Sequence, residues 1–184
     1  MSLEKEEICA QLLVVRRRRG DPAALEELIR IWQDRLFYFV RRLVSNEEDA
    51  WDALQETWLA VMRGLDKQEM RSVIPWMYGI ARNKALDKLR VKYADQELLT
   101  DNISAVASDE EVREFSFEDA EQVHMALDKL PIRHREVLTL HFLGELSVEE
   151  TAQVLAVPPG TVKSRLYHAK RSLRAVLEEE AGKE

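Results

Sequence analysis

A basic stretch near the C-terminus carries residue types that could bind nucleic acid. Between Thr161 and Arg174 the sequence TVKSRLYHAKRSLR has five Lys or Arg side chains and no acid, although the chain has a formal net charge of -7. Lys and Arg bind phosphate oxygens, and polar side chains hydrogen-bond base edges in the grooves of a duplex. The stretch predicts a DNA-binding surface; a solvated amphipathic helix with no partner is the alternative.

The residues before this stretch complete a predicted helix-turn-helix. Ser147 and Glu150 have the spacing of a capping box, a short helix follows to Leu155, and AVPPG forms a tight connection to the second helix. The second helix buries one face in this prediction, formed by Val162, Leu166, Ala169 and Leu173. The predicted DNA contacts lie on its other side: Thr161, Lys163, Ser164, Arg165, Tyr167, His168, Lys170, Arg171 and Arg174. The early-helix residues are expected to reach bases, and Arg165, Lys170, Arg171 and Arg174 to hold phosphates.

A second basic segment precedes the middle of the chain. Between Arg71 and Lys92 there are six bases against one acid, Asp87, which gives a local charge of +5. An acidic segment comes before it, because Glu47–Glu56 contains five acids and no base. A basic partner surface would complement these acids, although acids in the first turns of a helix also stabilise its own dipole.

The sequence predicts an all-α fold of two small helical domains. Apolar residues recur at helical spacing outside one acidic stretch, and no segment shows the alternation of a strand. We predict an N-terminal domain over residues 1–92, an acidic flexible linker over 93–118 and a C-terminal domain over 119–184. The predicted helices are about 3–19, 22–44, 46–64, 73–92, 119–129, 132–142, 148–155 and 159–179.

Single residues mark several of the predicted helix ends. Gly20 suits the left-handed position after a helix, and Asp21 with Pro22 resembles a cap and a first-turn proline. Ser45 and Glu48 have capping-box spacing for the third helix. The apolar stripe of that helix is expected to face the core: Trp51, Leu54, Trp58, Val61 and Leu65.

Composition excludes several classes of protein. No run approaches the roughly 18 apolar residues of a membrane span, and the N-terminus lacks a secretory pattern, so a cytoplasmic protein is expected. The single Cys9 cannot form an internal disulfide. The histidines do not pair with Cys or carboxylates at metal-ligand spacing, and no glycine-rich phosphate loop occurs. We expect no metal, no cofactor and no catalysed reaction.

Both predicted domains resemble a known family. LPIRHREVLTLHFLGELSVEETAQVLAVPPGTVKSRLYHAKRSL resembles the minus-35 binding domain of bacterial sigma factors of the sigma-70 family, extracytoplasmic function (ECF) group. GDPAALEELI, EEDAWDALQETWLAV and WMYGIARNKALDKLR resemble region two of the same group, in the family's order. The resemblance implies a promoter-specificity factor that binds core RNA polymerase and promoter DNA, and it makes an anti-sigma factor a further candidate partner.

The resemblance also implies roles for individual residues. The positions that match the family's contact with the clamp helices of the polymerase's largest subunit are Asp49, Asp52, Gln55, Glu56 and Trp58. Trp51 and Ala53 depart from the pattern, because the family usually has an acid and a bulky aliphatic residue there. The predicted contacts with the minus-10 strand are Lys67, Met70, Arg71, Arg82, Asn83, Lys84 and Lys88. Trp76 and Tyr78 fit either the core or a stacking platform for bases.

The predicted linker is long enough for this function only when it is stretched. A coil of 26 residues spans about 30 Å on average and at most about 90 Å. Promoter elements two duplex turns apart lie about 70 Å from one another. The alternative functions are a stand-alone helix-turn-helix regulator, which would bind DNA without polymerase, and an enzyme, which would show metal- or nucleotide-dependent turnover.

Overall fold

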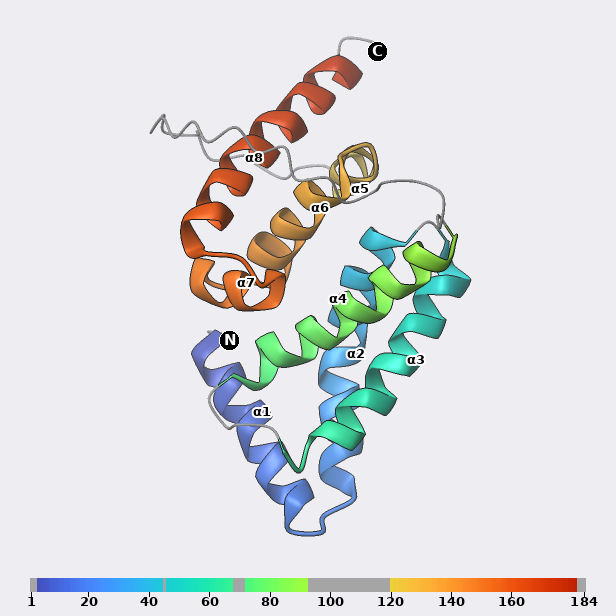
Figure 1. The fold of residues 1–184 in the computed structure, drawn as a ribbon, viewed down its shortest axis with the longest axis vertical. Coiled ribbons are helices and arrows are strands. Elements are labelled where there is room, and N and C mark those ends of the chain that lie inside the picture. Colours follow the sequence, from blue (N-terminus) through green and yellow to red (C-terminus); the bar gives the residue numbers. More distant parts are fainter. Residues whose placement is uncertain (1–2, 45, 68–71, 93–119, 182–184) are drawn as a thin grey trace.

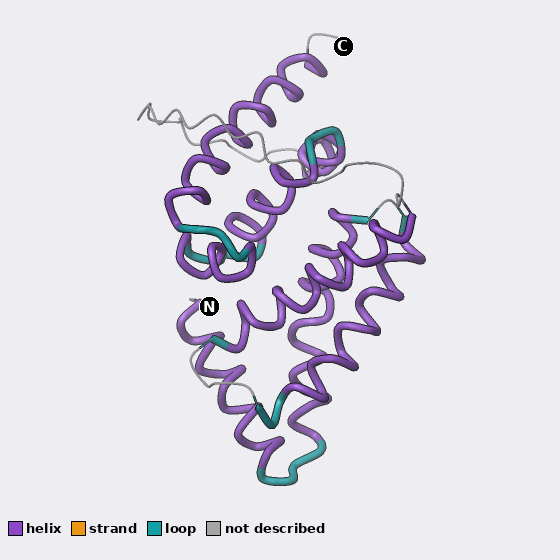
Figure 2. The backbone as a smooth tube through the Cα atoms, viewed as in Figure 1, coloured by secondary structure: helices purple, strands orange, loops and turns teal. Residues whose placement is uncertain are grey.

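The computed structural model describes residues 3–44, 46–67, 72–92 and 120–181 of the chain. Within these ranges the backbone is helical apart from short turns, and no strand is present (Figures 1 and 2). The predicted linker at 93–118 and the predicted contacts Met70 and Arg71 lie outside the described residues. The all-α prediction is confirmed.

Two long antiparallel helices open the chain. Helix α1 covers Leu3–Arg18, and α2 covers Ala23–Leu43. Gly20 has φ 93°, so the left-handed position predicted after α1 is confirmed. The Asp21 carboxylate accepts a hydrogen bond from the Ala23 amide at 3.0 Å, which satisfies an orphan donor at the start of α2. Pro22 itself precedes the helix rather than lying in its first turn.

The next two helices lie side by side. Helix α3 covers Glu47–Gly64, and α4 covers Val73–Lys92. The predicted Ser45 capping box is wrong: the N-cap of α3 is Asn46, whose side chain accepts from the Asp49 amide at 2.7 Å. Gly64 allows close packing here, because a Cβ at this position would lie 2.6 Å from Cζ2 of Trp76.

The C-terminal helices are shorter and end in one long helix. Their bounds are Ala120–Asp128 for α5, Ile132–Leu138 for α6, Thr139–Leu143 for the π-helical turn η1, Val148–Leu155 for α7 and Pro159–Ala181 for α8. The Ser147 and Glu150 capping box of α7 is confirmed, with both of its hydrogen bonds present. The prediction of one continuous α-helix to Phe142 is wrong in its last turn. There the chain forms a wider π-helical turn, in which the Gly144 amide donates to the Thr139 carbonyl.

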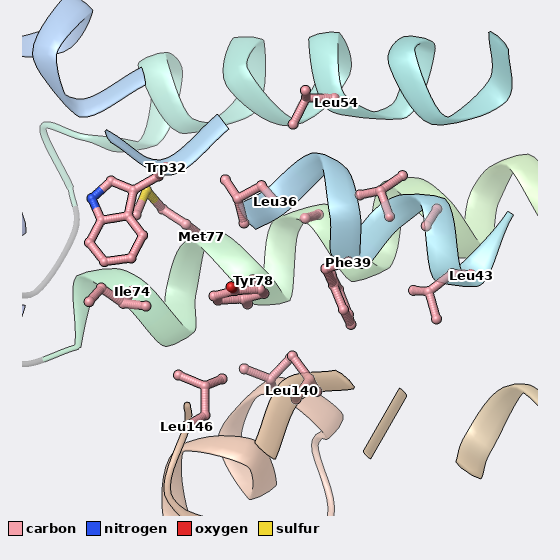
Figure 3. Packing of buried hydrophobic residues seen from close by; sticks show 14 of the residues in the cluster. Trp32, Leu36, Phe39, Leu43, Leu54, Ile74, Met77, Tyr78, Leu140 and Leu146 are labelled. Atoms are coloured by element: carbon pink, nitrogen blue, oxygen red, sulfur yellow. The ribbon is translucent and has the colours of Figure 1, made fainter. Parts of the chain in front are cut away.

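The core runs without interruption from α1–α4, here called the N-terminal half, into α5–α8, the C-terminal half. Trp32, Leu36, Phe39, Met77 and Tyr78 are its large members in the N-terminal half. Leu140 and Leu146 from the C-terminal half are also fully buried, and Figure 3 shows them directed toward α4 near Tyr78 and Ile74. Helix α4 packs against α7, and α2 packs against α6. The two halves therefore share an apolar interface, which the sequence did not predict.

Candidate nucleic-acid interfaces

Helix α8 has the geometry expected for the second helix of a helix-turn-helix. The turn before it places Ala156 in the left-handed region, with φ 54°. Val162, Leu166 and Ala169 are buried against the neighbouring helices, as predicted, and Leu173 packs against the edge of the core. Because one face is buried at this spacing, the residues between these positions remain at the surface.

The outer face of α8 is basic. Lys163 and Arg171 are exposed, and Tyr167, His168 and Lys170 are half-buried beside them. The Arg171 guanidinium lies 5.8 Å from the centre of the Tyr167 ring, and the Lys170 ammonium lies 5.0 Å from that of Phe142. Arg174 pairs with Glu178 one turn later, at 2.7 Å. This surface can offer several cations and two aromatic rings to a polyanion.

Two predicted DNA contacts on α8, Ser164 and Arg165, have polar atoms that lie nearer to the interior than expected. Thr161 and Arg165 are half-buried, and the Ser164 hydroxyl oxygen is fully buried. Arg165 lies near α6: burial raises the pKa of Glu136 and Arg165 is among the cations that oppose this rise, and Arg165 also adds to the lowering of the His134 pKa. Burial is the largest cause of the lowered His134 pKa. Ser164 and Arg165 thus lie between the basic face of α8 and its contact with α6.

Helix α4 presents some of its predicted contacts to solvent. Asn83 is exposed and Lys67, before the helix, is exposed as well. Tyr78 belongs to the core, where burial raises its pKa to about 12, and its ring lies edge-on to Phe39 at 5.4 Å. Trp76 is half-buried against Gly64. The structure therefore places Tyr78 in the core and leaves only part of Trp76 accessible.

The predicted DNA-binding lysines of α4 are paired with the predicted polymerase-binding acids of α3. Lys88 lies 3.1 Å from Glu56 and 3.3 Å from Asp52, and Lys84 lies 3.2 Å from Glu56. Hydrogen bonds from Lys88 and then Lys84 lower the pKa of Glu56. The Asp52 side chain is 55% exposed and that of Glu56 43% exposed, so each pair contributes at most about 1 kcal/mol.

Arg82 points away from the predicted DNA face and into the interface between the halves. Its Nε lies 2.8 Å from Oε1 of Glu136 on α6, and its Nη2 lies 3.5 Å from Oε2. The Glu136 side chain is 4% exposed and that of Arg82 17%. Burial raises the pKa of Glu136, and the charge of Arg82 opposes this rise. Arg82 is therefore unavailable to DNA in this arrangement.

Further polar contacts join the two halves. Arg42 on α2 donates to the His124 carbonyl and to Asp128, each at 3.1 Å. Arg135 on α6 donates in return to the Arg42 carbonyl at 3.0 Å. The Tyr38 ring lies 5.1 Å from that of His124. No sequence motif indicated these residues, since their types and spacing are ordinary for helix surfaces.

Helix α3 exposes an acidic face, and of its two tryptophans predicted to face the core only Trp58 does so. Trp51, predicted to face the core, is 44% exposed; it stacks on Phe37 at 4.2 Å and donates to Glu47. Trp58, predicted both for the core stripe and for a contact with polymerase, is 8% exposed. Gln55 and Asp52 are exposed, and Asp49 is bound to the Asn46 cap. Trp51 rather than Trp58 is thus the aromatic side chain that this face offers to a partner.

In the described ranges no group of three or more His, Cys, Asp or Glu side chains is placed to hold a metal ion. None of the described helices combines the length and the apolar composition that crossing a membrane requires.

Comparison with protein families matches both halves of the chain. Residues 28–93 match sigma-70 region 2, and residues 120–173 match sigma-70 region 4. The ECF RNA polymerase sigma factor SigM of Mycobacterium tuberculosis is 31% identical, over 86% of this chain and 79% of that protein. SigW of Bacillus subtilis, also an ECF RNA polymerase sigma factor, is 29% identical, over 87% of this chain and 92% of its own length.

Solved structures of similar fold agree with this result. The sigma factor RpoE, in complex with the anti-sigma factor NepR from Bartonella quintana, superposes with a TM-score of 0.66 at 25% identity, over 83% of this chain and 96% of that one. CnrH, in complex with the cytosolic domain of CnrY, gives a TM-score of 0.69 at 23% identity over 93% of this chain and 98% of that one, and so shares the fold. The chain belongs to the ECF group of the sigma-70 family, the promoter-specificity factors that direct RNA polymerase to initiate transcription.

Proposed function

We propose that α8 reads the minus-35 duplex, that α4 and the segment before it hold the minus-10 strand, and that α3 binds core RNA polymerase. The observation that carries this proposal is the basic outer face of α8, on a helix whose opposite face is buried behind a capped helix-turn-helix. A helix of this kind fits the major groove, where its first turns reach base edges.

The proposed polymerase surface is the exposed face of α3. It contains Asp49, Asp52, Gln55 and Glu56, together with the exposed ring of Trp51. Tryptophan is among the residue types most enriched at the hot spots of protein interfaces. Basic clamp helices on the largest polymerase subunit would complement the acids and speed association.

The proposal requires the two halves to separate. In the structure α4 contacts α7 and Arg82 contacts Glu136, whereas two promoter elements lie about 70 Å apart. The domain division at 1–92, 93–118 and 119–184 gives the tether that permits separation, with a reach of at most about 90 Å. Opening would free Arg82 for the minus-10 strand and expose Glu136 to water.

Other features of the proposal follow from the family. The factor works in the cytoplasm, catalyses no reaction and uses binding energy to favour the open strand, because that strand offers contacts that the duplex lacks. RpoE and CnrH were each solved with a bound protein, NepR in one case and CnrY in the other. An inhibitory anti-sigma partner is therefore proposed for this chain as well.

Run-off transcription with core polymerase on a promoter library tests the proposal. Selective initiation is expected for the wild-type chain, and Lys163→Ala is expected to reduce it. Lys129→Ala is a suitable control, because Lys129 is exposed, lies outside every proposed DNA contact and pairs with Glu180. Sequence-specific DNA binding without polymerase, combined with no selective start in its presence, would favour a stand-alone regulator instead.

A further inference from the structure

Helix α1 contacts both ends of the connection between α3 and α4. The Glu7 carboxylate accepts hydrogen bonds from the Val73 amide at 2.6 Å and the Ile74 amide at 2.9 Å. At the other end of α1, the Arg18 guanidinium donates to the Leu65 carbonyl through Nε at 2.9 Å and Nη2 at 2.6 Å. Figure 1 shows α1 passing beside the start of α4 and the end of α3.

Glu7 satisfies amides at the start of α4 that the helix cannot satisfy itself. The first amides of a helix lack intrahelical acceptors. Pro75 has no amide hydrogen, and the Trp76 amide bonds to the Ser72 carbonyl at 3.2 Å, which leaves the Val73 and Ile74 amides to Glu7. The first turn of α4 contains no acidic residue of its own, so Glu7 also supplies the negative charge that the helix dipole favours there.

Arg18 has the complementary role at the end of α3. The last carbonyls of a helix are orphaned and carry partial negative charge, and Leu65 directly follows Gly64, the last residue of α3. A cationic donor at this point therefore matches both the hydrogen-bonding and the charge requirement. Glu7 and Arg18 are 11 residues apart on one helix, which corresponds to about 16 Å along its axis.

The rest of α1 is fixed firmly enough to act as a rigid support. Glu6, itself buried, pairs with Arg35 of α2 through two contacts of 2.6 and 3.2 Å. Leu13 and Val14 are buried in the core. Gln11 donates to Glu7 at 3.0 Å and so orients its carboxylate. The positions of Glu7 and Arg18 are thereby set by α2 and by the core.

We propose that α1 is a positioning element for capture of the minus-10 strand, acting through Glu7 and Arg18 as positioning residues. This inference rests on the proposed function of α4 and the segment before it. By holding Leu65 at one end and Val73 with Ile74 at the other, α1 fixes how the connection leaves α3 and enters α4. It therefore controls how well the protein distinguishes one minus-10 sequence from another, and not only how stably it folds.

The experiment compares holoenzymes assembled from core polymerase and the Glu7→Gln, Arg18→Ala or Arg18→Lys chains. Labelled single-stranded oligonucleotides carry the minus-10 sequence selected from the promoter library, or single-base changes in it. The measured quantity is the ratio of affinities for the selected and the changed strands. This ratio is independent of the fraction of active protein, so a loss of stability alone would not alter it.

We expect the affinity ratio to fall about tenfold for Glu7→Gln and Arg18→Ala, because each loses hydrogen bonds that involve a charged group. Arg18→Lys should keep part of the discrimination, since an ammonium can still donate to the Leu65 carbonyl. Affinity for core polymerase and for minus-35 duplex should stay within about twofold of wild type. Arg17→Ala and Glu26→Gln change exposed charges on α1 and α2 and serve as matched controls.

An unchanged ratio in both Glu7→Gln and Arg18→Ala would overturn the inference, even if total activity fell. Amide hydrogen exchange gives a second measurement on the free protein: Val73 and Ile74 should lose protection in Glu7→Gln while the middle of α4 keeps it. Retained protection would also contradict the proposed support. If wild-type holoenzyme shows no selectivity among strands, the proposed function fails instead, and the exchange result still reports on the contact.

Discussion

The ion pair between Arg82 and Glu136 gives the sharpest test of the contact between the two halves. We call the form in which the halves are in contact closed, and the form in which they are separated open. Arg82→Ala leaves the Glu136 carboxylate, whose side chain is 4% exposed, without its cationic partner. Removing one member of a buried pair typically costs about 3 to 5 kcal/mol, because a buried charge is left uncompensated. If this cost falls on the interface, the ratio of closed to open molecules drops by about a hundred- to several-thousandfold.

The equilibrium between closed and open molecules depends on pH with a definite sign. Burial raises the pKa of Glu136 above its usual 4.5 in the closed form, whereas in the open form the carboxyl meets water. Protonation therefore favours closure, and its contribution is fully present below the open-form pKa and lost as pH rises through the closed-form pKa. Arg82 opposes the rise in pKa, so its removal should increase the pH dependence of closure.

The distance between spin labels on the two halves would measure closure. Labels at Arg30 on α2 and Gln153 on α7, both exposed, in a Cys9→Ser background, give the distribution for each variant. Wild type should show one short distance, and Arg82→Ala a broad set of longer ones at neutral pH. Adding Glu136→Gln to Arg82→Ala should restore much of the population with the short distance between labels, because the unpaired buried charge is removed. An Arg82→Ala distribution identical to wild type would refute the role of this pair.

Other predictions follow from the helices that carry the proposed sites. Lys163→Ala should reduce the slope of log affinity against log salt for minus-35 duplex by about 0.9 if Lys163 contacts one phosphate, as a salt titration would show. Trp51→Ala should weaken core polymerase binding by at least about tenfold without a large change in Tm, whereas Trp58→Ala should destabilise the fold by about 3 to 5 kcal/mol, as measured by denaturant titration. Ser147→Ala should cost about 1 kcal/mol by the same titration, because it removes the N-cap of α7; a loss below the error of the titration would contradict that role.

Local patterns predicted most of the elements correctly. Gly20 and the Ser147 capping box mark helix ends through short-range chemistry that depends on few neighbours, and both predictions hold. Helical spacing also placed Val162, Leu166 and Ala169 in the core. Asn46 displaced Ser45 as a cap because adjacent Asx and Ser residues offer equivalent acceptors, and spacing alone does not choose between them.

The failed predictions concern features that depend on distant parts of the chain. Trp51 and Trp58 are seven residues apart and lie on the same side of an ideal helix within about 20°. Which of them is buried is decided by the neighbouring helices, and Phe37 on α2 covers only one side of Trp51. The partner of Arg82 is 54 residues away in sequence, so no local pattern could identify Glu136. Basic composition marked the α4 segment as cationic but did not indicate which of its cations face solvent.

The two sets of ion pairs around α4 differ in how easily their carboxylate partners can be replaced. Lys84 and Lys88 pair with exposed carboxylates on α3, where each pair contributes at most about 1 kcal/mol, so phosphates can replace the carboxylates at small cost. Arg82 pairs with a buried carboxylate, and exchanging that partner requires the two halves to move apart. In the proposed function, polymerase binding at α3 would compete directly for Asp52 and Glu56, whereas Arg82 would be released only when the two halves separate. DNA contacts through the lysines should accordingly form in closed and open molecules alike, while those through Arg82 form in open molecules alone.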